Sequence, residues 1–286
     1  FDVFYGGFTA CNVNAVTKSG ANEWHGSAFF DYTNDSMRGD KLEGEPIRVG
    51  DYSEKRYGAT LSGPIIKDRL FFFGFMRYAD WNKINMTEPT IARDSSAADP
   101  YWGGKLDWLI TSSHRLEGTF LSDETTVDNR YLAVDPVSGE IGSHLGDGYS
   151  LRGGRNWVLK YTGVLSPQLV LSAQAGANPF ERTNRTTADD ACPYAYDTRD
   201  GSWNRIGCWV IALPESLADE RRAYRVDLDW IVGNHSLRAG VDAEANASVH
   251  EMTYSGGLYY RYFLNGVPGA HAETFLFCVL EVAHDP

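Results

Sequence analysis

The stretch from His235 to His250, HSLRAGVDAEANASVH, decides the fold because it alternates almost without interruption. One set of alternate positions is aliphatic: Leu237, Ala239, Val241, Ala243, Ala245, Ala247 and Val249. The other set is mostly polar or charged: Ser236, Arg238, Gly240, Asp242, Glu244, Asn246, Ser248 and His250. Successive side chains of a β-strand point to opposite faces, so this stretch predicts one long strand with an apolar and a charged face. Such a strand is typical of a wall between lipid and water.

The same alternation recurs along the chain and predicts an antiparallel meander. We expect strands near residues 24–33, 55–64, 69–80, 101–111, 115–126, 156–165, 168–180, 222–232 and 236–252. Short links with the composition of hairpin turns join three pairs of these strands, at residues 111–114, 166–168 and 232–235. Longer polar stretches, expected to be loops, lie near residues 34–54, 81–100, 127–154 and 184–221. Short turns at one end and long loops at the other predict an all-β fold, an antiparallel transmembrane β-barrel.

The composition narrows the possible partners. The 286 residues carry a formal net charge of −12, with 26 Lys and Arg against 38 Asp and Glu, which argues against binding to nucleic acid. No apolar run approaches the roughly 18 residues of a membrane helix. A barrel strand exposes only alternate residues to lipid, so outer-membrane lipid remains the expected partner.

Two segments near the start resemble one known family. Tyr5-Gly6-Gly7 followed by VNAVTKSGANEWHGS, residues 13–27, looks like the plug-to-barrel junction of TonB-dependent outer-membrane receptors, most of all their Oar-like branch. Residues 57–74, YGATLSGPIIKDRLFFFG, resemble the second barrel strand, periplasmic turn and third strand of that branch. The chain departs from the pattern at Cys11, where the branch usually has a small residue.

The resemblance implies a division of the chain. Residues 1–22 would be the C-terminal end of a plug domain, and residues 23–265 the N-terminal part of a transmembrane β-barrel. The tail, residues 266–286, loses the alternation and could form a strand or a short helix. About nine or ten strands are expected here, against about 22 in transporters of this class, so we expect a truncated product or a partial sequence.

Candidate functional side chains lie on the charged face of the expected strands. They are Lys105, Asp107, Lys160, Arg225, Asp227, Asp229, Arg238, Asp242 and Glu244. Such a mixture can bind a plug or pass a polar solute, but a structural ladder of salt bridges is the favoured interpretation. No zinc or calcium ligand spacing is present, so neither a metal nor a cofactor is expected.

Cys192 and Cys208 lie in one long polar stretch with Pro193, Gly201 and Gly207, which allow the chain to fold back. A loop disulfide is favoured over two free thiols, because the cell surface permits it.

Three functions compete. The resemblance implies a transporter of the bacterial outer membrane, which takes up an unidentified extracellular ligand. A TonB-type protein of the inner membrane would drive it through the plug. The first alternative is a surface adhesion or binding barrel that transports nothing. The second is a barrel enzyme, but Ser113 and His114 are adjacent in a turn and diverge, so no enzyme is expected.

Overall fold

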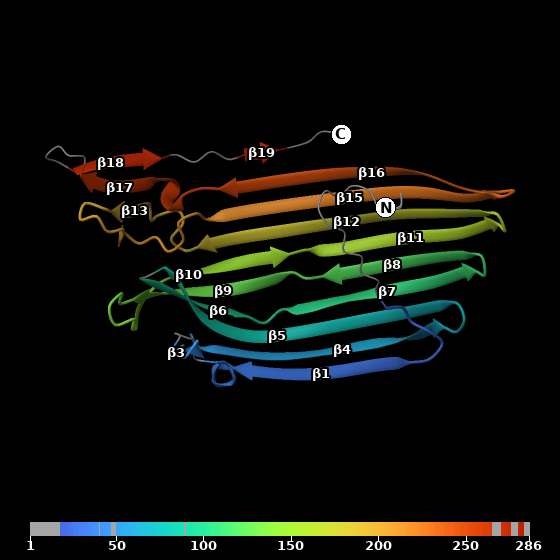
Figure 1. Cartoon of the computed structure of the whole chain (residues 1–286), viewed down its shortest axis with the longest axis horizontal. Coiled ribbons are helices and arrows are strands. Elements are labelled where there is room, and N and C mark those ends of the chain that lie inside the picture. Colours follow the sequence, from blue (N-terminus) through green and yellow to red (C-terminus); the bar gives the residue numbers. More distant parts are fainter. Residues whose placement is uncertain are drawn as a thin grey trace.

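The computed structural model describes residues 18–39, 41–46, 50–88, 90–264, 270–275 and 280–282. Within these ranges the chain forms one 13-stranded sheet with a four-stranded and a two-stranded sheet beside it (Figure 1). Its helical elements there are two single 3-10 turns, η1 (Asp35–Met37) and η2 (Ser255–Gly257). Over the same residues, no helix has the length and apolarity needed to cross a membrane. Most of the expected plug end, residues 1–17, lies outside the described ranges.

Every expected strand is present, and neighbours in the large sheet are antiparallel. Six continuous long strands are β1 (His25–Asn34), β4 (Tyr52–Ile66), β5 (Leu70–Glu88), β12 (Leu169–Thr186), β15 (Glu215–Val232) and β16 (His235–Met252). The others have a short break: β6 (Ile91–Ala97) with β7 (Pro100–Thr111), β8 (His114–Ser122) with β9 (Thr125–Val134), and β10 (Ile141–Gly153) with β11 (Arg155–Ser166). The tail contributes β18 (Ala270–Phe275) and β19 (Leu280–Val282), so its described part is extended.

The turns of the sheet divide between its two ends. Figure 1 shows the β4–β5, β7–β8, β11–β12 and β15–β16 turns together at one end, with the small sheets at the other. In the β4–β5 turn Asp68 has a positive φ of 60°. The Asn22 amide donates to the Asp68 carboxylate at 2.6 Å, and the Asp68 backbone N–H donates to Asn22 Oδ1 at 2.8 Å. The segment before β1 is therefore tied to the turn end.

Two of the expected loops are wrong. Residues 81–100 are a hairpin in which β5 runs to Glu88 and β6 starts at Ile91. Residues 127–154 likewise contain β9, which ends at Val134, and β10, which starts at Ile141. These segments do not alternate because they continue the wall beyond the lipid, where neither face has to be apolar.

The other two polar stretches do hold irregular structure. Within 34–54 a small hairpin forms from β2 (Lys41–Leu42) and β3 (Glu45–Pro46). Within 184–221 the flanking strands take the ends, and residues 187–214 form a loop with β13 (Tyr194–Asp197) and β14 (Asn204–Ile206).

In a water-soluble sheet the apolar side chains are buried and the charged ones are exposed. The large sheet shows the opposite pattern. Apolar side chains on one face, the apolar face, are open: Val241 is 73% exposed and Phe30 66%. On the other face, the charged face, two acids are covered: Asp107 is 2% exposed and Asp227 7%. Burial of apolar area stabilises a protein in water, so a face this open fits contact with lipid instead.

The charged face has an aromatic exception along β5. Phe71, Phe73 and Phe75 alternate with the apolar-face residues and so share the charged face. Glycine makes room for one of these rings, because a Cβ at Gly103 would lie 2.9 Å from Cζ of Phe75.

On most strands the apolar face is apolar only over the half of the sheet nearer the turns, whereas on β16 the aliphatic series continues to Val249. On β15 the series Trp230, Leu228, Val226, Tyr224 is followed by Arg222 and Glu220. On β5 the series from Leu70 to Tyr78 is followed by Asp80. Roughly nine residues at about 3.3 Å each cover about 30 Å along a strand, which on a tilted strand is close to the lipid band of a membrane barrel, about 25 Å tall. We call this the membrane half, and the remainder toward the loops the outer half.

Exposed aromatic side chains border the band. Toward the loops they are Tyr57, Trp102, Trp157 and Tyr224, and toward the turns they are Trp24, Trp108 and Trp230. Their rings have an apolar body and a polar group, which suits the two membrane–water boundaries.

The loop of residues 187–214 folds onto the outer half. A disulfide joins Cys192 to Cys208, as expected, with their Cα atoms 5.2 Å apart. Trp209 is fully buried and packs with Ile91 and Tyr131 of the wall. β13 pairs in parallel with β17 (Tyr259–Leu264), the one parallel contact among the described strands, and it lies outside the wall.

Candidate functional site

A compact ionic cluster occupies the charged face of the membrane half. β7 contributes Lys105 and Asp107, and β8 contributes Arg115 and Glu117, with Asp107 directly opposite Glu117 in the register. Lys105 Nζ lies 2.8 Å from Glu117 Oε1 and 3.6 Å from Asp107 Oδ1. Arg115 reaches the same two carboxylates at 2.6 Å for Asp107 and 3.1 Å for Glu117. Two cations and two anions compensate each other, so the cluster has little attraction left for a charged solute.

The same cluster contacts the segment that precedes β1. Lys105 Nζ donates to Ser19 Oγ at 3.0 Å. The Lys105 side chain is 10% exposed, and that of Asp107 is 3% exposed. The cluster can therefore hold residues 18–22 against the inside of the wall.

A second group of ion pairs crosses β15 and β16. Arg225 lies 2.7 Å from Asp227 and 3.7 Å from Asp242, and Arg238 pairs with Asp229. Arg221 lies 2.6 Å from Glu244. Eight of the nine expected residues thus have an ionic partner: Lys105, Asp107, Arg225, Asp227, Asp229, Arg238, Asp242 and Glu244. Lys160 has no ion pair with any described residue, although its alternation places it on the charged face with Gln174 opposite.

This geometry agrees with the salt-bridge ladder, and a role of these residues in binding a ligand stays a prediction. Arg115, Glu117 and Arg221 were not among the candidates expected from the sequence. The signal was present for the first two, because the alternation in 115–126 places them on the charged face beside Lys105 and Asp107.

A different site lies in the outer half, on the same face. A cavity of about 470 Å³ is bounded by six strands, from β5 across to β15. A hydrogen-bonded row of small polar side chains forms its floor, one from each of β6, β9, β10 and β12. Ser95 Oγ donates to Asn129 Oδ1 at 2.8 Å, Asn129 Nδ2 to Ser150 Oγ at 3.0 Å, and Ser150 Oγ to Asn184 Oδ1 at 2.9 Å. Ser95 and Asn129 are each 3% exposed, so the hydrogen bond between them is shielded from water.

The charges around this floor are not balanced. Four cationic side chains line the cavity, Lys83, Arg93, Arg152 and Arg182, against one carboxylate, Glu215. Glu215 pairs with Arg182 at 3.0 Å and lies 3.7 Å from His250. The cavity was not predictable from the sequence because Lys83, Arg93 and Arg152 lie in segments expected to be loops.

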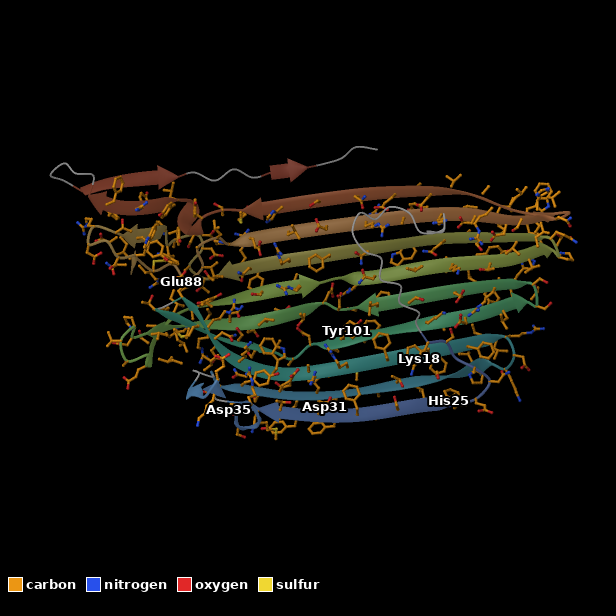
Figure 2. The ribbon with its side chains drawn as sticks, in the orientation of Figure 1. Lys18, His25, Asp31, Asp35, Glu88 and Tyr101 are labelled. Atoms are coloured by element: carbon orange, nitrogen blue, oxygen red, sulfur yellow. A yellow bond between two sulfur atoms is a disulfide. The ribbon has the colours of Figure 1, made fainter. Side chains whose placement is uncertain are left out.

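The 187–214 loop contacts the wall next to this cavity. The Tyr196 hydroxyl donates to Glu88 Oε2 at 3.2 Å. Burial raises the pKa of Tyr196 above its ordinary value, and the nearby Glu88 carboxylate raises it further. Burial also raises the pKa of Glu88, which Figure 2 shows at the loop end of the sheet, far from His25. Among the described residues, no cluster of His, Cys, Asp and Glu could hold a metal ion.

Comparisons with known proteins agree with this architecture. A family model described as an outer membrane beta barrel domain matches residues 16–92 and 78–266. The TonB-dependent transporter Oar of Myxococcus xanthus is 29% identical over 260 residues, which covers 74% of this chain and 24% of that protein. The crystal structure of the outer membrane transporter YddB from Escherichia coli matches in fold, with a TM-score of 0.55 and 11% identity over 89% of this chain and 36% of that one. The chain thus spans about a quarter of the curated relative's length.

Proposed function

This chain belongs to the outer membrane beta barrel domain family, and from that premise we propose that it forms part of an energy-coupled transporter. Its location is the bacterial outer membrane. The resemblance carried by residues 13–27 and 57–74 to TonB-dependent receptors is confirmed by a curated relative described as a TonB-dependent transporter.

The observation that carries the proposal is the wall with a lipid-facing band and an ionic inner face that holds the segment before β1. A passive surface barrel needs the band but not the contact from Lys105 to Ser19. In the proposal, residues 1–22 end a plug, residues 23–265 belong to the wall, and a TonB-type protein of the inner membrane moves the plug when a ligand binds outside. The relatives are described as transporters, and we propose no catalytic reaction.

Uptake can be tested before the ligand is known. A strain that lacks the gene and the same strain with the gene restored would be grown in one complex medium, and solutes remaining in the medium measured by mass spectrometry. We expect at least one solute to be consumed only when the gene is present, and a protonophore to abolish that difference. Equal consumption by the two strains, with ligand retained on the surface of the restored one, would favour the adhesion or binding barrel instead.

The contact between the wall and the segment before β1 has its own test. Lys105→Ala removes the bond to Ser19 and one cation of the buried cluster, whereas Lys160→Ala removes an unpaired lysine from the same face. In lipid vesicles that contain the complete gene product, we expect Lys105→Ala to leak a small neutral sugar faster than Lys160→Ala does. The same leak rate from both variants would argue against a plug held at this cluster.

A further inference from the structure

The cavity in the outer half has an unusual charge pattern for this chain. The chain as a whole has a net charge of −12, yet four cations and one carboxylate line this cavity. No ion pair joins Lys83, Arg93 or Arg152 to any described acid, and only Arg182 has one, to Glu215. The ionic cluster of the membrane half, by contrast, contains as many acids as bases.

Two of these cations are placed where they repel each other. Arg152 on β10 lies directly opposite Arg182 on β12 in the antiparallel register, and both line the cavity. Like charges directly opposite on one face of a sheet destabilise it. The arrangement becomes favourable when an anion lies between the two guanidinium groups.

Some donors around the cavity also have no acceptor. The Nε atoms of Arg93 and Arg182 are buried and make no hydrogen bond. A buried donor without a partner destabilises the protein, and more so when it is charged. An oxyanion in the cavity would instead accept from the terminal N–H groups of the arginine side chains that line it, because a guanidinium group offers paired N–H donors in the geometry of a carboxylate or phosphate.

We propose that this cavity is a binding site for an oxyanion, a solute that carries carboxylate or phosphate groups. The four cations would hold the negative groups, and the row from Ser95 to Asn184 would form a polar floor beneath the solute. A volume of about 470 Å³ suits a small solute. The site lies above the lipid band, on the face that becomes the lumen of a closed wall.

This inference deepens the proposed function and rests on it for the uptake of the solute. Binding itself can be measured without transport. The complete gene product would be purified in lipid nanodiscs and titrated by calorimetry, at low ionic strength, with citrate, inorganic phosphate and neutral maltose. We expect citrate or phosphate to bind and maltose not to bind. The anion that binds more tightly then shows whether carboxylate or phosphate is the preferred group.

The variants compare the two faces of the wall. Arg152→Gln removes an unpaired cation from the cavity, and Arg185→Gln makes the same change on the opposite face of β12, where Arg185 lies 3.8 Å from Glu251. Loss of one charged hydrogen bond predicts binding about 10-fold to 100-fold weaker for Arg152→Gln and unchanged for Arg185→Gln. Glu215→Gln removes the one carboxylate among the described lining residues and should tighten binding. Lys83→Gln replaces Arg152→Gln if that variant does not fold.

The results separate the two proposals. Suppose that anion binding weakens in Arg152→Gln but that the uptake experiment shows no gene-dependent consumption. That result would support the binding site and overturn the transporter. The inference is overturned if neither anion binds, if maltose binds equally well, or if Arg152→Gln and Arg185→Gln bind alike.

Discussion

The membrane half and the outer half of the sheet are built from the same strands but lie in different surroundings. In the membrane half one face must be apolar, and most of the charged candidates on the other face are ion-paired, as at Lys105 and Glu117. In the outer half both faces meet water, the alternation is lost on most strands, and cations gather without matching acids, as at Lys83, Arg93 and Arg152. Lipid thus constrains one end of each strand, while the other end is free to form a binding surface.

The largest effect is expected from Asp107→Ala in the membrane half. Its carboxylate contacts both Lys105 and Arg115, and removing one partner of a buried charge cluster costs about 3–5 kcal/mol. Asp229→Ala is the matched control, because Asp229 is 39% exposed in its pair with Arg238 and should cost about 1 kcal/mol or less. Urea titrations of folding into lipid vesicles would measure both. Similar losses from the two variants would mean that the cluster is not buried in the membrane-inserted protein.

The second-largest effect is expected to depend on how deep in the lipid-facing band an arginine is introduced. Val241 lies opposite Val226 in the middle of the band, so Val241→Arg should cost about 2–4 kcal/mol. Ala245 also belongs to the apolar face, but it lies opposite Arg222 at the border with the outer half, so Ala245→Arg should cost about 1 kcal/mol or less. The same folding titrations apply. A greater loss of folding free energy for Ala245→Arg than for Val241→Arg would mean that the border between the two halves lies elsewhere.

The disulfide should act on the outer half alone. Cys192 and Cys208 are separated by 16 positions, and opening a loop of that size costs no more than about 3 kcal/mol. In Cys192→Ser with Cys208→Ser, we expect faster hydrogen exchange in residues 187–214 and unchanged exchange in β7 and β8. Exchange that also rises in β7 and β8 would show that the two halves unfold together.

The smallest effect concerns an exposed pair in the outer loop. Arg199 holds the pKa of the Asp197 carboxyl at about 2, below its ordinary 3.8, through side-chain hydrogen bonds. A lowered pKa means that the pair stabilises the loop above about pH 4 and loses that contribution as the pH falls toward 2. Carbon NMR titration should return the Asp197 pKa toward its ordinary value in Arg199→Ala. An unchanged midpoint in that variant would exclude Arg199 as the cause.

The membrane half was predictable in detail because each strand there obeys one rule. Trp230, Leu228, Val226 and Tyr224 had to alternate with charged residues, and the structure places them on the exposed face. The charged candidates followed from the same rule, and eight of them proved to be ion-paired. The outer half was not predictable in this way, since residues 81–100 and 127–154 look like loops when neither face has to be apolar.

Alternation along the chain was sufficient to establish the strands of the membrane half, their two faces, their antiparallel order and the contact with lipid. It could do so because hydrocarbon accepts only apolar side chains, and this restricts every second residue. The register between strands distant in sequence decided the rest. It placed Arg152 opposite Arg182, aligned Ser95, Asn129, Ser150 and Asn184 in one row, and brought Ser19 to Lys105. Such contacts depend on which residues pair across the sheet, and no local pattern in the chain records that pairing.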